Sequence, residues 1–194
     1  RYGADALRYH LSINMPENHD TDFTWPDFVD KVNNELIATY GNFIHRVLTL
    51  AERLSDGDDG NPLVPFDNID ICSEECVKLQ ELHATVTDSL TRYRYKEALR
   101  AVMSAAQFGN QMLQSAAPWE HMKGDSDSGL RDESFARLAL GWRLCRYLAI
   151  TSHPFMPSQA QRLWESLGEG GLVSDVAWDD ALNWSSPIKW NPEK

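Results

Sequence analysis

Apolar residues recur every three to four positions along most of the chain, the spacing that places side chains on one face of an α-helix. This pattern predicts long helices over about 3–14, 25–54, 73–91, 96–115 and 130–151, followed by a shorter helix that ends at Gly168. Polar stretches and Gly- or Pro-containing stretches separate them, so we expect the chain to reverse between neighbours. The fold class predicted is all-α, an antiparallel helix bundle with short connections.

The same periodicity predicts which side chains are buried. Over 25–54 the apolar stripe runs from Phe28 to Leu54 without a helix breaker, and Thr24, Pro26 and Asp27 form a typical helix start. The stripes of the first and third helices give a further set of expected core residues: Leu7, Leu11, Met15, Val77, Leu82, Val86 and Leu90.

The helical spacing stops after Gly168. Residues 170–194 hold Trp178, Trp184 and Trp190 but show no apolar repeat. Since large indoles are most often packing anchors, these residues are interpreted as an extended tail. We therefore expect a helical domain over 1–169 and a C-terminal tail, 170–194, that packs on the bundle.

Charge bears on the possible partners. The 194 residues carry 18 basic and 29 acidic side chains, a net charge of −11, which argues against a nucleic-acid partner because phosphate contacts need Lys and Arg, and no DNA partner is expected. Positive charge is nevertheless concentrated locally, around the junction of the third and fourth helices and on the second: Arg92, Arg94, Lys96, Arg100, Arg46 and Arg53.

The longest apolar stretch, 138–150, is interrupted by Arg143 and Arg146, so no membrane span is expected. The N-terminal residues show no signal-peptide pattern. An odd, small number of cysteines fits a reducing compartment, and we expect a cytoplasmic protein; they are Cys72, Cys76 and Cys145.

No combination of residues has the spacing of a catalytic site. The six histidines are scattered, and no Ser or Cys stands in a nucleophile-elbow context. Cys72 and Cys76 have no further ligand nearby, so a structural metal is not expected. The chain is predicted to be non-catalytic, without a metal or cofactor of its own.

Two polar features have no obvious role in a core. Asn42 and Arg46 are four residues apart on the second helix, with His45 beside them; they form either a solvated flank or a hydrogen-bonding pair on one face. Pro118-Trp119 follows a helix end, and its indole is either a core anchor or a flat face for stacking an unpaired base.

Several motifs resemble a known family. Residues 3–8, Gly-Ala-Asp-Ala-Leu-Arg, resemble the signature that opens the helical anticodon-binding domain of class I aminoacyl-tRNA synthetases. Segments 22–28, 32–36 and 41–47 narrow this resemblance to the methionyl-tRNA synthetase family, in particular its archaeal and eukaryotic-type branch. Motifs at 95–99, 110–119 (from Asn110 to Pro118-Trp119) and 153–157 follow in that family's order, so the resemblance covers nearly the whole chain.

The resemblance implies binding of a CAU anticodon loop. Asn42 and Arg46 occupy the positions that face the first anticodon base, with His45 beside them, and Pro118-Trp119 occupies the aromatic platform. The chain departs from the family at Ala38, where a second Asn is expected, so no role is carried to that position. An Asn–Arg pair on a base edge and an indole on its face suit recognition of an unstacked base.

The resemblance also implies a larger parent enzyme, a methionine–tRNA ligase. Its ATP, Mg²⁺ and zinc chemistry belongs to a catalytic domain of the same chain that these residues do not include, and its partner is tRNA. Two alternatives stay open: the equivalent domain of a leucyl, isoleucyl, valyl or cysteinyl enzyme, or a helical interaction module with no RNA role. The second is distinguished by whether Trp119 lies beside Asn42 and Arg46 or deep in the core.

Overall fold

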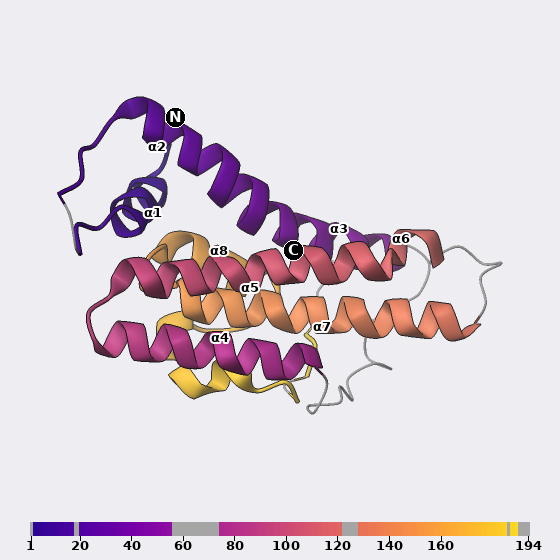
Figure 1. The fold of residues 1–194 in the computed structure, drawn as a ribbon. Helices are drawn as coiled ribbons and strands as arrows, with labels where there is room; N and C mark the ends of the chain where they lie inside the picture. Colours follow the sequence, from indigo (N-terminus) through magenta and orange to yellow (C-terminus); the bar gives the residue numbers. More distant parts are fainter. Residues whose placement is uncertain (1, 18–19, 56–73, 122–127, 186, 190–194) are drawn as a thin grey trace.

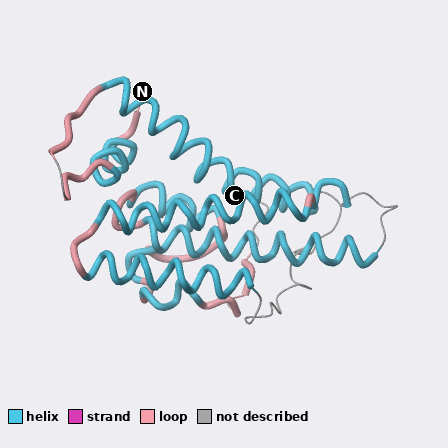
Figure 2. The backbone as a smooth tube through the Cα atoms, in the orientation of Figure 1, coloured by secondary structure: helices cyan, strands magenta, loops and turns pink. Residues whose placement is uncertain are grey.

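A computed structural model describes residues 2–17, 20–55, 74–121, 128–185 and 187–189. Every regular element within these ranges is helical, and no strand occurs among them (Figure 2). The body consists of α4 (Glu74–Thr91), α5 (Tyr95–Ala116) and α7 (Ser128–Ser152), which run antiparallel with α5 packed against both others (Figure 1). The predicted all-α bundle is confirmed. Leu54's side chain, Cys72 and Trp190 lie outside the described residues.

A second part of the fold lies across this body. It comprises α1 (Ala4–Ile13) and a continuous helical rod made of α2 (Trp25–Asp30), η1 (Lys31–Gly41) and α3 (Asn42–Ser55), which crosses the body obliquely (Figure 1). The predicted start of the rod is confirmed, since Thr24 Oγ1 accepts a hydrogen bond from the Asp27 backbone N–H at 3.3 Å. Both α1 and η1 pack on α5.

The middle of the rod differs from the regular α-helix that the sequence predicts. Over Lys31–Gly41 the turns are π-helical, and the Asn42 N–H bonds the Ile37 carbonyl five residues back. The amide of Asn110 on α5 donates to the Thr39 carbonyl at 2.9 Å, so the end of this wider segment is bound by a neighbouring helix. The stripe still reaches the core through Phe28, Tyr40 and Phe43.

The expected burial of α1 is wrong. Leu7 and Leu11 are 42% and 52% exposed, and the helix instead buries Asp5, Tyr9, His10 and Ile13. The buried polar groups have partners from distant segments, because Tyr9 Oη donates to Glu35 and Asp5 accepts from the Gln159 N–H. Burial also lowers the pKa of His10, which favours its neutral form.

The stripe of α4 is only partly as expected. Val86 is buried, but Val77 is 44% exposed, and the buried face is shifted toward Cys76, Leu79 and His83. The His83 ring stacks on Trp178 from the C-terminal tail at 5.4 Å between ring centroids. Burial lowers the pKa of His83 as well. The tail therefore covers α4 at His83, and the periodicity of α4 itself could not show this.

The C-terminal segment makes two short 3₁₀ turns, η3 (Val173–Asp175) and η4 (Trp178–Leu182), after α8 (Pro157–Ser166). Trp178 Nε1 donates to Thr87 Oγ1 of α4 at 2.8 Å, and Trp184 is 3% exposed. Near its end Lys189 pairs with Glu169 at 2.5 Å. These contacts fasten the segment to the bundle.

Gly168 ends α8 in the left-handed region, with φ of +74°. Its N–H bonds the Glu165 carbonyl at 3.0 Å, and the Lys189 carbonyl of the returning tail approaches closely. A Cβ at this position would lie 2.6 Å from that oxygen. Both the backbone conformation and the close approach require glycine.

None of the helices within the described ranges is both apolar enough and long enough to cross a membrane.

We expect Gly168→Ala to lower the free energy of unfolding by about 1–3 kcal/mol, because it combines a left-handed backbone with a clash against Lys189. Gly170→Ala is the matched control, since a Cβ there meets nothing within 4 Å, and its effect should stay within about 0.5 kcal/mol. Urea unfolding followed by circular dichroism measures both. If the two variants were equally stable, the structural requirement for glycine at position 168 would be contradicted.

Candidate functional site

The structure brings the sequence-predicted polar pair and the predicted indole together. Asn42 begins α3 and Arg46 follows one turn later, while Pro118 and Trp119 form the start of α6 (Pro118–His121). The reversal between α5 and α6 occurs at Ala117, which has φ of +39° and bonds the Leu113 carbonyl. This turn folds the Trp119 ring back onto α3, where its centroid lies 5.1 Å from Arg46 Cζ.

A side chain to which the sequence analysis gave no role in the site connects these residues. Asn110 of α5 accepts hydrogen bonds through Oδ1 from Asn42 Nδ2 at 3.0 Å and from Arg46 Nη1 at 3.4 Å. Its Nδ2 donates to the carbonyls of Thr39 and Ala106. Asn110 thus ties the start of α3 to α5.

This network fixes the orientation of two amides. A guanidinium only donates and a carbonyl only accepts, so Asn110 must direct Oδ1 at Arg46 and Nδ2 at Thr39. Asn42 must then approach Asn110 Oδ1 with its own Nδ2. The exposed Asn42 is left with its Oδ1, a hydrogen-bond acceptor, outside these bonds among the described residues.

Arg46 is held only by neutral groups within the described part of the chain. Besides Asn110, its Nη2 donates to Gln114 Oε1 at 3.3 Å, and its guanidinium lies over the Trp119 ring. Such a contact contributes about 0.5–1 kcal/mol at an exposed site. No carboxylate neutralises Arg46 here, so its full positive charge remains available to a ligand.

Trp119 is neither deep in the core nor fully exposed. Its ring is half-buried and packs against the edge of the core, while Pro118 beside it is buried. The neighbours Asn42 and Gln114 are exposed, and Arg46 is half-buried. We call Asn42, Arg46, Asn110, Gln114 and Trp119 the anchor cluster.

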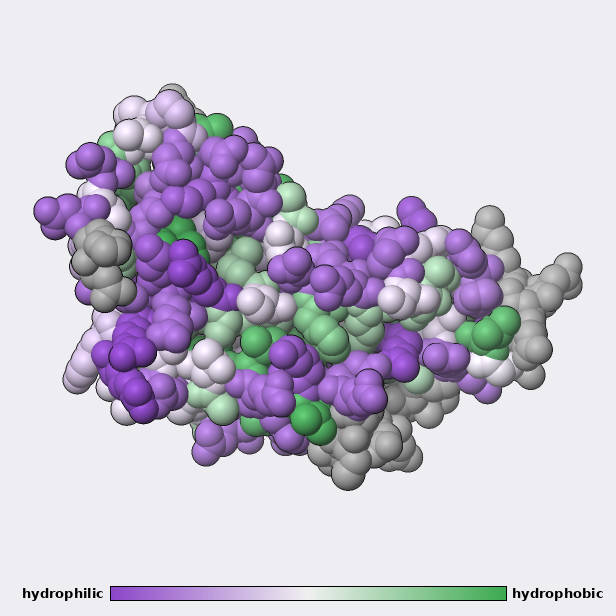
Figure 3. Space-filling view, in the orientation of Figure 1, coloured by the Kyte–Doolittle hydropathy of each residue, from purple (hydrophilic) through white to green (hydrophobic). Residues whose placement is uncertain are grey.

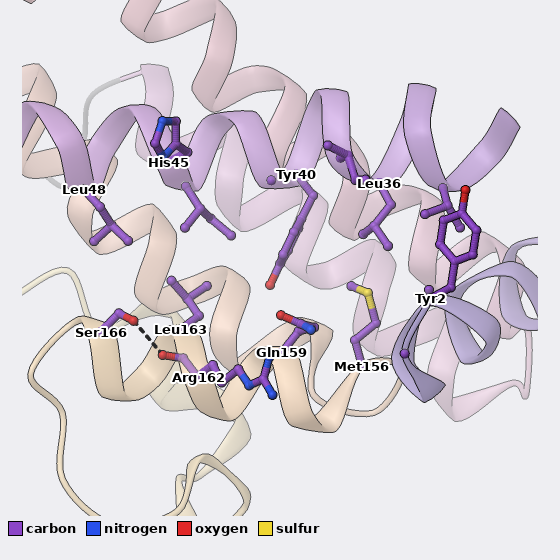
Figure 4. A pocket seen from close by; sticks show the side chains of 16 residues that line it. Tyr2, Leu36, Tyr40, His45, Leu48, Met156, Gln159, Arg162, Leu163 and Ser166 are labelled. Carbon is purple, nitrogen blue, oxygen red and sulfur yellow. Dashed lines mark hydrogen bonds between the residues drawn. The ribbon is translucent and has the colours of Figure 1, made fainter. Parts of the chain in front are cut away.

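His45 lies outside the anchor cluster. It lines a cavity of about 530 Å³ between the α2–η1–α3 rod and α8 (Figure 4). Figure 4 shows His45 with Tyr40 and Leu48 on one wall and Gln159 and Leu163 of α8 on the other. Because it lies one position before Arg46, His45 falls on another face of α3.

Asn110 and Gln114 are the members of the cluster that sequence reasoning missed. They are four residues apart, the same spacing as Asn42 and Arg46. Both pairs, Asn42/Arg46 and Asn110/Gln114, could be recognised in the sequence as polar residues spaced i,i+4 on different helices. Nothing in the sequence shows that residues 64 and 68 positions apart meet, as Arg46 does with Asn110 and Gln114.

The cluster contains groups that donate, accept, stack and carry positive charge. It has no nucleophile or general base. Within the described ranges, no three or more His, Cys, Asp or Glu side chains are placed to hold a metal ion.

Two family models match the chain. Residues 70–185 match the anticodon binding domain of methionyl tRNA ligase, and residues 1–48 match the class I tRNA synthetases, methionine type. The first match covers more than half of the chain and includes Asn110, Gln114 and Trp119. The second includes Asn42 and Arg46.

Relatives with the name methionine–tRNA ligase are similar over most of the chain. The protein from Methanopyrus kandleri is 39% identical over 185 residues, which are 93% of this chain and 25% of that protein. The protein from Flavobacterium johnsoniae is 35% identical over 200 residues, 93% of this chain and 27% of the relative. The chain thus spans about a quarter of the length of these relatives.

Solved structures with the same fold include methionyl-tRNA synthetase of Mycobacterium tuberculosis in its free state. It superposes with a TM-score of 0.74 at 21% identity, over 87% of this chain and 33% of that one. The same synthetase bound by methionyl-adenylate gives a TM-score of 0.74 at 19% identity, over 98% of this chain. At this identity the likeness concerns the fold alone.

We expect Asn110→Ala to lower the free energy of unfolding by about 1–2 kcal/mol, because it removes the amide that joins Thr39, Asn42 and Arg46. Gln111→Ala is the control, since it removes an exposed amide next along α5 that is not in the cluster, and it should cost less than about 0.5 kcal/mol. Urea unfolding compares them. A larger loss for Gln111→Ala would refute the bridging role.

Proposed function

The chain belongs to the family of methionyl tRNA ligase anticodon-binding domains, and from this we propose that it binds the anticodon loop of a tRNA through the anchor cluster. The observation that carries the proposal is the placement of Arg46 between two amide oxygens and the Trp119 ring. A donor, an acceptor and an aromatic face then lie within the reach of one base. Single-stranded bases are recognised in this way, by stacking and by contacts to their Watson–Crick edge.

The free acceptor of Asn42 suggests which base is read. Because the network commits Nδ2 of Asn42 to Asn110, only its Oδ1 can face a ligand, and it requires a donor opposite. Cytosine presents an amino group at that edge, whereas uracil presents a carbonyl. Arg46 can donate to the remaining acceptors of cytosine. This supports cytosine as the first base of the proposed CAU anticodon.

Binding requires Arg46 to exchange one contact for others. In the free chain its guanidinium lies over the Trp119 ring, on the face that a base would stack against. Base stacking contributes about 1–3 kcal/mol, more than a surface cation–π contact of about 0.5–1 kcal/mol. We propose that the base takes the indole face while Arg46 turns to the base edge.

The acidic net charge is compatible with this mode of binding. Recognition of a splayed loop depends on stacking and base-edge hydrogen bonds, and Arg46 supplies a positive charge that no carboxylate among the described residues offsets. A solvated polar flank, the alternative interpretation of Asn42 and Arg46, does not account for their convergence on Asn110 and Trp119.

We further propose that the whole protein ligates methionine to tRNA in the cytoplasm, with ATP, Mg²⁺ and zinc bound in a catalytic domain of the same chain. The names of the relatives support this proposal. The chain itself would contribute binding alone, because its cluster lacks a nucleophile and a general base. His45, on another face of α3, would contact the loop only outside the first-base position.

Replacement of the first anticodon base C by U should weaken binding of an anticodon stem-loop by about 1–3 kcal/mol, since a carbonyl then faces Asn42 Oδ1. Asn42→Ala should reduce this difference, because the acceptor is gone. Fluorescence anisotropy of labelled stem-loops measures the four dissociation constants. Equal discrimination by wild type and Asn42→Ala would remove Asn42 from base reading.

Trp119→Ala should weaken binding of the CAU stem-loop by about 1–3 kcal/mol through loss of the stacking face. Trp25→Ala is the matched control, since Trp25 is 67% exposed on α2 and not in the cluster. The same titration gives both values. If all three proteins bind identically, the helical interaction module without an RNA role becomes the better explanation.

A further inference from the structure

A second polar groove lies beside the anchor cluster, where α1 and η1 meet α5. It has a volume of about 500 Å³. Figure 3 shows hydrophilic side chains gathered around the angle between the α1–η1 part and the body. The basic residues that line the groove are Lys31, Lys96 and Arg100.

Lys96 and Arg100 place two like charges one turn apart on α5. Such a pair is unfavourable for the helix itself, because both ammonium and guanidinium groups face the same groove. Neither side chain has an ion-pair partner among the described residues. By contrast, Arg92 pairs with Asp88 at 2.9 Å and Arg94 with Glu97 at 3.4 Å, outside the groove lining.

The position along α5 adds to the positive potential. Lys96 lies in the first turn of this helix, which begins at Tyr95, and the N-terminal end of a helix carries partial positive charge. A cation there is opposed by the helix dipole, whereas an anion is favoured. The Glu17 carboxylate already meets the Lys96 backbone N–H at this helix end, so a further anion would be bound by the Lys96 and Arg100 side chains.

The carboxylates around the groove are engaged with other groups. Glu35, which lines it, accepts a hydrogen bond from Tyr9 Oη, and Asp27 pairs with Lys31 at 3.0 Å. Glu17 accepts from the Lys96 backbone N–H at 2.9 Å. Lys31 is compensated by Asp27. Glu35 and Glu17 keep their negative charge, but neither forms an ion pair with Lys96 or Arg100 among the described residues, so the charged ends of these two side chains can bind an anion.

The groove adjoins the anchor cluster at Thr39. Thr39 lines the groove, and its carbonyl accepts from Asn110 of the cluster. From Asn110, the helical rise along α5 places Arg100 about 15 Å and Lys96 about 21 Å away. An RNA strand that continues from a base held at the cluster would cover these two distances with several nucleotides.

We propose that Lys96 and Arg100 bind backbone phosphates of the RNA strand that leads from the anticodon loop into its stem. This inference rests on the proposed function and extends it with a contact that is independent of base sequence. Phosphate contacts position a nucleic acid, and base contacts specify it. The groove would fix the direction of the strand while the anchor cluster reads the base.

The test compares stem-loops with C and with U at the first anticodon position across a series of salt concentrations. Lys96→Gln and Arg100→Gln should each weaken both RNAs by the same factor, about fivefold to tenfold. The slope of log affinity against log salt should decrease by about 0.7–0.9 for each contact removed. Circular dichroism confirms that each variant is folded, which is expected because Arg100 is exposed and Lys96 half-buried.

Arg92→Gln is the control, since it changes the net charge equally but removes a side chain paired with Asp88. It should leave affinity and slope unchanged. Unaltered slopes in Lys96→Gln and Arg100→Gln, or an equal effect of Arg92→Gln, would overturn the inference. The two proposals can fail separately. If the wild-type protein bound both RNAs equally, base reading would be refuted. If the salt slopes still decreased in Lys96→Gln and Arg100→Gln, the phosphate contact would be supported.

Discussion

The position of the candidate site depends on the side-chain amide of Asn110. Its two ends bind groups that cannot exchange roles, a guanidinium on one side and backbone carbonyls on the other. This single amide therefore sets the place where α3 begins against α5 and the direction in which Asn42 presents its oxygen. Hydrogen bonds are directional, so an amide at a helix contact fixes the relative orientation of the two helices, whereas packing of aliphatic side chains does not.

The π-helical segment is part of the same constraint. Wide turns are uncommon, and they are found frequently at functional sites. Here η1 ends directly before Asn42, and its Thr39 carbonyl is bound by Asn110. The rod thus changes from π-helical to α-helical turns immediately before Asn42 and Arg46. The turn that precedes these two residues is held in place by α5.

Sequence periodicity predicted the helices because it reports the spacing of apolar positions, and that spacing survives in α5 and in the rod. It failed for α1, where Asp5 and His10 are buried and Leu7 is exposed. Burial of these polar groups depends on partners such as the Gln159 N–H, which lies 154 residues away from Asp5. Local pattern carries no information about such partners.

The candidate site was predictable to a similar extent. Asn42, Arg46 and Trp119 were found from local spacing and from the resemblance, and the fold brings them together. Asn110 was missed because its importance comes from the meeting of two helices, and His45 was grouped with Arg46 although adjacent helical residues point in different directions. The missing information was tertiary in both cases.

The makeup of the anchor cluster has a consequence for acidity. Asparagine, glutamine and tryptophan side chains do not ionise, and arginine keeps its proton at any pH that proteins experience. The cluster therefore has no proton to gain or lose between mildly acid and mildly alkaline solution. The scaffold differs, because its buried histidines, His10 and His83, resist protonation when folded and accept it when unfolded. Acid would loosen the framework of this protein before it altered the chemical character of its recognition surface.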